Sequence, residues 1–311
     1  MDTDSESVVT RISCDYSLNE KQWIAYCIIT KYFLQKFVAK KDTADHLCML
    51  MTGPGGTGKT HVVCTVKSIM EHYNCAHIIQ FLAPTGSAAN LIDGMTIYKG
   101  LGIKIHSQRK GKGNREPGED GEDLSVIISV KNHTQLRDEW KNIKFLLVDE
   151  SSLLSLQLIA EIDHALRFAK ETLDVWFGGV ALIFAGDLFQ YPPVGRSPLY
   201  TPISPHAHQT NDEIQKRLGR LAWKTINTIV NLTEQQRMKD DVEYGEAVAR
   251  LRVHECTLAD AELFNMRLTK SFTYAEGVDM GLPDNNNACA IVIGNSLHEA
   301  LNKKKAEACC P

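Results

Sequence analysis

The chain has 311 residues, of which 43% are hydrophobic, 23% charged and 7% aromatic. This mixture is typical of globular proteins and excludes a wholly disordered chain, and the length suits two domains better than one small module. The 34 basic and 38 acidic side chains give a formal net charge of −4, which excludes a globally basic nucleic-acid binder but allows a local basic groove.

Three features of the sequence bear on the compartment. The longest apolar stretch, residues 175–186, is too short for a helix that spans a bilayer, so we expect a soluble protein without a membrane partner. The acidic start, residues 1–6, does not look like a signal or transit peptide, so we expect no processed leader. The nine cysteines form no CxxC pair, which favours reduced thiols in a cytosolic or nuclear compartment.

Helical and strand patterns alternate along the first part of the chain. Ser17 and Glu20 have the spacing of a capping box, and apolar residues at near-helical intervals up to Val38 predict an N-terminal helix. Short apolar runs, each followed by a loop and a helical pattern, predict strands at residues 47–51, 78–82, 145–148, 180–184 and 229–232. This alternation indicates an α/β fold in which helices cover a parallel sheet.

Two other segments differ in composition from this pattern. Residues 107–123 are almost free of apolar side chains and predict a surface loop. We interpret it as a solvated insertion rather than a contact to a polyanion, because the negative charge of its acidic half cancels the positive charge of its basic half within a Debye length. Beyond residue 232, the pattern predicts helices at residues 242–253 and 258–268, a loop at 283–287 and one strand at 289–293, too little for an independent α/β domain.

Residues 53–60 match the phosphate-loop pattern GxxxxGK[ST] and lie between a predicted strand and a predicted helix. Glycines let backbone N–H groups turn toward phosphates, a following lysine supplies a mobile cation, and a threonine hydroxyl can ligate Mg²⁺. The alternative, a flexible glycine turn, does not explain the helix and strand on either side. The residues expected to hold the nucleotide here are Gly53, Gly55, Gly56, Thr57, Gly58, Lys59 and Thr60.

Acidic and amide side chains follow two of the later predicted strands. Asp149 and Glu150 come directly after residues 145–148. A phosphate loop needs a carboxylate on a neighbouring strand to hold the metal, so we expect Asp149 to bind Mg²⁺ through water and Glu150 to polarise the attacking water. Gln190 follows residues 180–184 and can sense the γ-phosphate by a hydrogen bond. Without the phosphate loop, the two acids would fit an ordinary strand end equally well, and Gln190 would be interpreted as part of an ordinary exit from a strand.

In combination these residues resemble the petite-integration-frequency helicases, a family of superfamily 1B DNA helicases encoded by cells and by helitron-type transposons. The resemblance covers residues 18–237, most of the chain, and implies a RecA-like P-loop NTPase domain with a parallel sheet covered by helices, plus the start of a second RecA-like domain. Four further stretches are similar to motifs of that family: residues 18–22 to its adenine-reading Q motif, 82–89 to its motif Ia, 96–102 to its motif Ib and 232–237 to its motif IV.

The resemblance also implies roles for residues at the nucleotide. Gln22 would contact adenine, Lys59 and Thr60 the phosphates and the metal, and Gln190 the γ-phosphate. Arg237 would reach in from the second domain and stabilise the charge on the transferring phosphoryl group. The alternative for Arg237 is a solvated arginine on a helix.

For DNA, the resemblance implies that the loops of motifs Ia and Ib hold the phosphates of a single strand without reading sequence. The sequence departs from the family at three positions, because the family usually has His-Ser where Tyr98 and Lys99 stand and Leu where Tyr191 stands. An aromatic ring and a cation can still stack on a base and pair with a phosphate. The residues implied in DNA binding are Pro84, Thr85, Gly86, Thr96, Tyr98 and Lys99.

The implied domain plan is an N-terminal helical segment with the Q motif at 1–45, a first RecA-like ATPase domain at 46–232 and a partial second RecA-like domain at 233–311. The implied activity is that of an ATP-dependent DNA helicase or single-strand translocase with 5′-to-3′ polarity. Its cofactors would be ATP and Mg²⁺, and its partners single-stranded DNA and junctions between single and double strands. A nuclear location is expected from the family.

Two alternatives to helicase activity remain open. The family's motifs V and VI are not found in the sequence, so a nucleotide- and DNA-binding module without productive unwinding is the second hypothesis. The chain would then be a truncated gene product, an engineered fragment or a diverged element whose remainder lies elsewhere. A small-molecule phosphotransferase fits the phosphate loop but leaves Gln22, Gln190 and Arg237 without a role.

Overall fold

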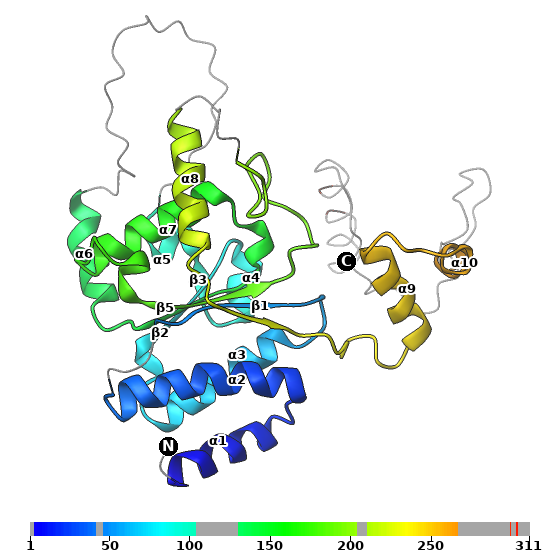
Figure 1. Ribbon diagram of the computed structural model, residues 1–311, viewed down its shortest axis with the longest axis horizontal. Helices are drawn as coiled ribbons and strands as arrows, with labels where there is room; N and C mark the ends of the chain where they lie inside the picture. The colour runs from blue at the N-terminus through cyan, green and yellow to red at the C-terminus, as the bar shows by residue number, and fades with distance from the viewer. Residues whose placement is uncertain are drawn as a thin grey trace, which may run out of the picture. The chain divides into compact units, whose positions relative to one another are not determined.

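The computed structural model describes residues 3–41, 46–103, 130–203, 210–266, 299 and 303. The chain divides into two compact units, Met1–Cys256 and Thr257–Pro311. The larger unit is an α/β domain, and the smaller unit contributes helix α10 (Leu258–Met266) to the described residues (Figure 1). The sequence-based domain boundary between residues 232 and 233 stays a prediction.

The larger unit is built on a six-stranded sheet in the order β3-β2-β4-β5-β1-β6, in which all paired strands are parallel. The strands are β1 (Cys48–Thr52), β2 (Ile79–Ala83), β3 (Met95–Thr96), β4 (Phe145–Val148), β5 (Ala181–Gly186) and β6 (Thr228–Asn231). The predicted strands are confirmed within two residues. β3 was not predicted, because two residues are too few for a hydropathy pattern.

Helices cover both faces of this sheet, as Figure 1 shows. One face carries α1 (Thr3–Asp15), α2 (Glu20–Phe33) and α3 (Lys59–His72), and the other carries α6 (Val130–Trp140), α7 (Leu156–Ala169) and α8 (Asn211–Trp223). Alternate residues of β1 enter the two cores, Met49 and Met51 on the α2 and α3 side and Cys48 and Leu50 on the other. Burial on both faces explains why the four inner strands, β1, β2, β4 and β5, read as continuous apolar runs.

The capping box of the N-terminal helix lies two residues later than predicted. Asn19 is the N-cap of α2, and its side chain accepts a hydrogen bond from the backbone of Gln22, whose side chain accepts one from the backbone of Asn19. The predicted pair of Ser17 and Glu20 is therefore wrong. Ser17 lies in the left-handed region at φ +49° and its backbone N–H donates to Cys14 O, so it ends α1 instead of starting α2.

Shorter helices complete the larger unit: α4 (Gly86–Leu91), α5 (Ile97–Gly100) and α9 (Val242–Arg252), while α2 continues into a π-helical turn (Leu34–Val38). The helix predicted at 242–253 is confirmed, and α10 accounts for that predicted from residue 258. The loops predicted at 107–123 and 283–287 and the strand predicted at 289–293 lie outside the described residues. None of the helices in the described part of the chain is long and apolar enough to cross a membrane.

Candidate functional site

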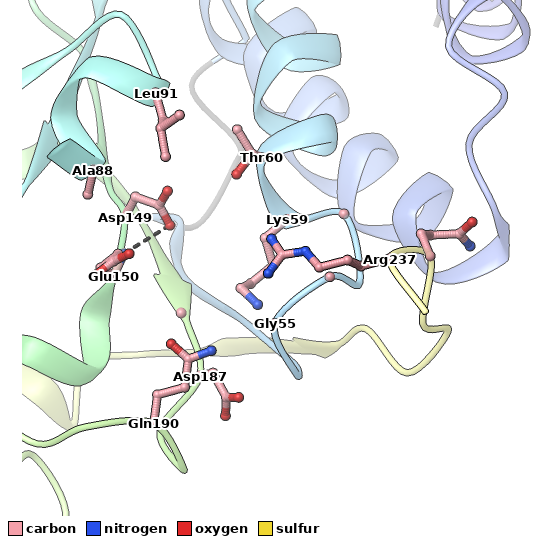
Figure 2. Close-up of a pocket in the computed structure, with 14 residues that line it drawn as sticks. Gly55, Lys59, Thr60, Ala88, Leu91, Asp149, Glu150, Asp187, Gln190 and Arg237 are labelled. Carbon is pink, nitrogen blue, oxygen red and sulfur yellow. Dashed lines mark hydrogen bonds between the residues drawn. The ribbon is translucent and has the colours of Figure 1, made fainter. Parts of the chain in front are cut away.

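The main candidate site lies where β1, β4 and β5 end. Because these strands are parallel, their carboxyl ends meet at one edge of the sheet, the usual place for ligands in open α/β sheets. A cavity of about 500 Å³ opens there (Figure 2). Its lining consists of Gly55, Gly56, Gly58, Lys59, Thr60, Ala88, Leu91, Asp149, Glu150, Gly186, Asp187, Gln190, Gln236 and Arg237.

The phosphate loop, residues 53–58, connects β1 to α3 along one wall of this cavity. Gly56 and Gly58 adopt φ angles of +90° and +83°, which side-chain-bearing residues rarely adopt. The Lys59 Nζ donates hydrogen bonds to the backbone oxygens of Gly53, at 2.7 Å, and Pro54, at 3.0 Å. The cation therefore rests on carbonyls of the loop itself, which phosphate oxygens would replace as its partners.

Thr57 was expected to hold the nucleotide, and the structure shows what its side chain does. The side chain is fully buried, and its hydroxyl donates to the backbone oxygen of Pro54 at 2.9 Å. The hydroxyl therefore closes the loop on itself, so any contact from Thr57 to a phosphate comes from its backbone. Gly53, at the start of the loop, faces Leu232, whose backbone oxygen would lie 2.2 Å from an added Cβ. Gly53 therefore serves close packing of the loop against the end of β6.

The two predicted acids, Asp149 and Glu150, follow β4 and line the cavity together with Lys59. The backbone N–H of Glu150 donates to Asp149 Oδ1 at 2.9 Å, the dashed line in Figure 2. Glu150 itself adopts φ +52°, a left-handed conformation that is uncommon for a residue other than glycine and that clusters at functional sites. The structure thus brings both predicted acids to the phosphate loop.

Burial and charge shift the proton affinities of this cluster. Burial raises the pKa of Asp149, while the Glu150 N–H and Lys59 act in the opposite direction. Burial and then the negative charge of Asp149 raise the pKa of Glu150, and Lys59 again opposes the change. Burial lowers the pKa of Lys59, against the attraction of Asp187 and Asp149. A raised carboxylate pKa is a common property of a general base.

Arg237 and Gln190 reach the same cavity from two other segments. Arg237 lies on the loop after β6, and Figure 2 shows its guanidinium beside Lys59, facing the acids. It belongs to the larger compact unit, whereas we expected it to come from a second domain. Gln190 lies on the loop after β5, where its backbone N–H donates to Asp187 O at 2.9 Å. The structure therefore gathers all four predicted catalytic residues in one cavity.

The predicted metal ligands fit Mg²⁺ by their chemistry. Thr60 and Asp149 both line the cavity, and each offers an oxygen ligand. Mg²⁺ prefers hard oxygen ligands and commonly takes one or two from the protein, with the rest from phosphate and water. These two side chains are therefore suitable to hold the ion of a bound metal–nucleotide complex.

Sequence reasoning missed a contact between the loop after β5 and α9. Asp187, only 3% exposed, accepts a hydrogen bond from the guanidinium of Arg252, which also lies 4.4 Å over the ring centroid of Phe189. The contact joins residues 65 positions apart, so no local pattern predicts it. It attaches α9 to the loop that carries Gln190.

A second cavity, of about 400 Å³, brings together part of the predicted DNA-binding set. Its lining consists of Pro84, Thr85, Tyr98, Leu153, Ser155, Leu158, Glu161, Pro193, Val194 and Arg196. Gly86, Thr96 and Lys99 are not part of it. The hydroxyls of Thr85 and Thr96 cap α4 and α5 by accepting from backbone N–H groups, and Lys99 is exposed at the end of α5.

Arg196 is the basic residue of this cavity, and sequence reasoning missed it. Its Nη1 lies 3.9 Å from Glu161 Oε1, and its guanidinium lowers the pKa of Tyr98, which burial and Glu161 raise. Val194, two residues before it, is 97% exposed. A basic residue just after the turn at 192–195 is the sequence signal that would have found it.

Comparisons with known proteins agree with this fold. The PIF1-like helicase family matches residues 30–251. ATP-dependent DNA helicase PIF1 of Saccharomyces cerevisiae (strain YJM789) is 28% identical over 203 residues, which cover 65% of this chain and 21% of that relative. The crystal structure of Pif1 helicase from Candida albicans superposes with a TM-score of 0.61 at 21% identity over 93% of this chain and 54% of that one.

A second similar structure is Pif1 helicase from Bacteroides in complex with ADP-AlF3 and single-stranded DNA. Its TM-score is 0.56 at 24% identity, and the match covers 88% of this chain and 56% of that one. At these identities the likeness shows the fold alone. This chain spans about half the length of the solved helicases and about a fifth of the length of the yeast relative.

Proposed function

Because this chain belongs to the PIF1-like helicase family, we propose that it acts as an ATP-dependent DNA helicase, hydrolysing MgATP and moving along single-stranded DNA with 5′-to-3′ polarity. One observation carries the proposal: a single cavity joins a phosphate loop to Glu150, Gln190 and Arg237. A simple phosphate-binding protein needs the loop but not a base, a γ-phosphate sensor and an added arginine. A nuclear location is part of the same proposal.

The residues of the cavity have separate roles in the proposed hydrolysis. When MgATP binds, Lys59 exchanges the oxygens of Gly53 and Pro54 for phosphate oxygens. Thr60 and Asp149 would hold the metal ion of the bound nucleotide, which would supply electrostatic stabilisation of the phosphates. Glu150 accepts a proton from the attacking water, and its raised pKa gives it the affinity for that proton.

Two further groups act on the γ-phosphate. Gln190 donates a hydrogen bond to it, and Arg237 stabilises the charge that develops on the transferring group. Both lie on loops that follow strands of the sheet, β5 and β6, which gives each group a rigid support. Loss of the γ-phosphate releases these contacts, and this release couples hydrolysis to movement of the loops.

The second cavity is proposed to hold the DNA strand. Thr85 and Tyr98 offer a hydroxyl and an aromatic ring, and Arg196 offers a cation that is 40% exposed. A cation and an aromatic ring form the usual combination for phosphates and stacked bases of a single strand. The name of the Bacteroides structure, which includes single-stranded DNA, supports the same partner for this chain.

A second candidate function is a binding module that holds nucleotide and DNA without productive unwinding. The observation in its favour is that, within the described residues, both candidate cavities lie on elements around one parallel sheet. Helicases of the family that this chain resembles hydrolyse ATP in a cleft between two RecA-like domains. The two functions differ in turnover, because a binding module holds ATP without hydrolysing it.

DNA-stimulated ATP hydrolysis tests the proposed function. Steady-state hydrolysis of MgATP is measured with and without a single-stranded oligonucleotide, with Lys59→Ala as the blank. Turnover that rises with DNA, is absent in the blank and weakens as salt increases supports a helicase motor. ATP binding without turnover favours the binding module, and a rate indifferent to DNA contradicts the proposed partner.

The DNA cavity gives a separate prediction. Arg196→Ala is expected to weaken binding of a single-stranded oligonucleotide roughly five- to tenfold and to flatten its salt dependence, because one cationic contact to phosphate is lost. Fluorescence anisotropy over a salt series measures both quantities. Arg11→Ala, on the exposed surface of α1, is the control and should leave binding unchanged. An unchanged salt slope in Arg196→Ala would place the DNA elsewhere.

A further inference from the structure

Helix α5 carries two of the predicted DNA-binding residues. It is a single turn, Ile97–Gly100, in which Tyr98 lines the second cavity and Lys99 is exposed. So short a helix has little stability of its own, and the backbone carbonyls at its C-terminal end lack partners inside the helix. The positions of Tyr98 and Lys99 therefore depend on what holds the two ends of α5.

The sheet holds the N-terminal end of α5. Thr96 belongs to β3 and pairs with Ala83 of β2, and its hydroxyl accepts a hydrogen bond from the backbone N–H of Lys99 at 3.3 Å. The C-terminal end packs so closely on β2 that a Cβ added to Gly100 would lie 2.4 Å from Leu82 Cδ2. Gly100 is buried there, so its carbonyl needs a hydrogen-bond donor from within the protein.

Trp140, the last residue of α6, supplies that donor. Its indole Nε1 donates to the backbone oxygen of Gly100 at 2.8 Å, and the residue is only 2% exposed. The two residues are 40 positions apart, so the contact joins two separate elements of the fold. The indole thus caps the C-terminal end of α5 from outside the helix.

α7 and its C-cap residue, Lys170, hold Trp140 in turn. The Lys170 Nζ donates to the backbone oxygens of Trp140, at 2.6 Å, and Ile143, at 2.5 Å. The Arg137 guanidinium, one turn earlier on α6, lies over the ring of Phe168, 4.6 Å from its centroid. These contacts fix the end of α6, so the indole N–H reaches α5 from a rigid support.

From this geometry we infer that Trp140 is a positioning residue for DNA binding, whose indole N–H holds α5 so that Tyr98 and Lys99 meet the strand in one orientation. The inference rests on the proposed function, since it assumes that α5 and the second cavity bind single-stranded DNA. Without this hydrogen bond the end of α5 frays, and DNA binding then has to order Tyr98 and Lys99 at a cost in entropy. Among the described residues, the lining of the nucleotide cavity includes no member of this network.

Binding of a single-stranded oligonucleotide to the full chain, measured by fluorescence anisotropy, tests this inference. Trp140→Phe keeps an aromatic ring in the core but removes the N–H donor. We expect it to weaken DNA binding roughly five- to tenfold, as for a buried carbonyl left without its donor, and to leave the affinity for MgATP unchanged. Hydrogen–deuterium exchange at the Leu101 N–H, which donates to Ile97 O, should become faster.

A double-mutant cycle separates positioning from a general loss of stability. The second background is Tyr98→Ala with Lys99→Ala, measured at low salt, where the remaining phosphate contacts keep binding measurable. If Trp140 acts through α5, Trp140→Phe should weaken binding at most roughly twofold in that background. An equal loss in both backgrounds overturns the inference, as does unchanged binding in Trp140→Phe alone.

Trp223→Phe is the matched control. Trp223 packs against the same hydrophobic core as Trp140, and its ring centroid lies 5.2 Å from that of Phe184 on β5. The same substitution at this position should leave DNA binding unchanged. A loss shared by the two variants would show a general structural effect and overturn the inference.

The remaining outcomes separate the inference from the function beneath it. Circular dichroism checks that each variant folds. If Trp140→Phe does not fold, replacement of Trp140 by benzothienylalanine, in which sulfur takes the place of the indole N–H, carries the same comparison. A wild-type chain that binds no single-stranded DNA overturns the proposed partner and the inference with it, whereas DNA binding that ignores the N–H donor overturns the inference alone.

Discussion

Replacing Glu150 with Gln is expected to lower the rate of ATP hydrolysis roughly 10²- to 10⁴-fold while MgATP still binds. The amide keeps the shape of the side chain but cannot accept a proton from the attacking water. It also removes one negative charge beside Asp149, whose field raises the pKa of Glu150. Binding is therefore expected to be unchanged or slightly tighter, so the loss should fall on kcat and not on KM.

The raised pKa of Glu150 adds a pH dependence to this result. Glu150 works as a base only when ionised, and burial and Asp149 hold its pKa above the ordinary value. As the pH is lowered, the rate of hydrolysis by the wild type should therefore begin to decline at a higher pH than it would with an unperturbed glutamate. The residual rate of Glu150→Gln should lack this decline.

Rates of hydrolysis across a pH series measure both effects. Glu139→Gln, the same change on the exposed surface of α6, serves as the control and should behave as the wild type. If Glu150→Gln keeps most of the wild-type rate, another group is the base and the assignment of the acids is wrong.

Replacing Arg237 with Ala is expected to lower hydrolysis by roughly 10³-fold or more, the effect of losing an arginine that faces a transferring phosphoryl group. Arg237 lies in the cavity beside Lys59 and faces the acids (Figure 2). Lys at the same position should restore little, because an ammonium group cannot reproduce the planar fork of a guanidinium.

Single-turnover hydrolysis and MgATP affinity, measured together, locate this effect. A large fall in the single-turnover rate, with the affinity for MgATP changed only a few-fold, supports a role for Arg237 in the transition state. Arg11→Ala on α1 is the control for loss of a positive charge. Should Arg237→Ala hydrolyse ATP as the wild type does, Arg237 is the solvated arginine of the alternative interpretation.

Most of the sheet was predictable because its four inner strands are buried on both faces. Runs such as residues 145–148 are continuously apolar, and this pattern does not depend on their neighbours. β3 has two residues and gains its identity only from pairing with β2, so the sequence carries no signal for it. The capping box was misplaced because Ser17 and Asn19 are both good N-caps, and the end of α1 decides between them.

The candidate site was predictable where its residues are neighbours in the sequence. The phosphate loop and the pair of Asp149 and Glu150 are local patterns next to apolar strands, and the structure brings them together. The contacts of Gln22 with Thr57 and of Arg252 with Asp187 join residues 35 and 65 positions apart. Such pairs depend on how the elements pack, which a single sequence does not show.

The position of β1 in the sheet has a consequence for how the protein is made. β1 precedes both of its partners, β5 and β6, whose paired residues lie more than a hundred positions later in the chain. Contacts this distant in sequence close slowly, because the intervening chain loses much conformational entropy when they form. During synthesis, β1 therefore completes its pairing only after β5 and β6 have been made. Because the phosphate loop follows β1, bound nucleotide is expected to stabilise the completed sheet more than a partly formed one.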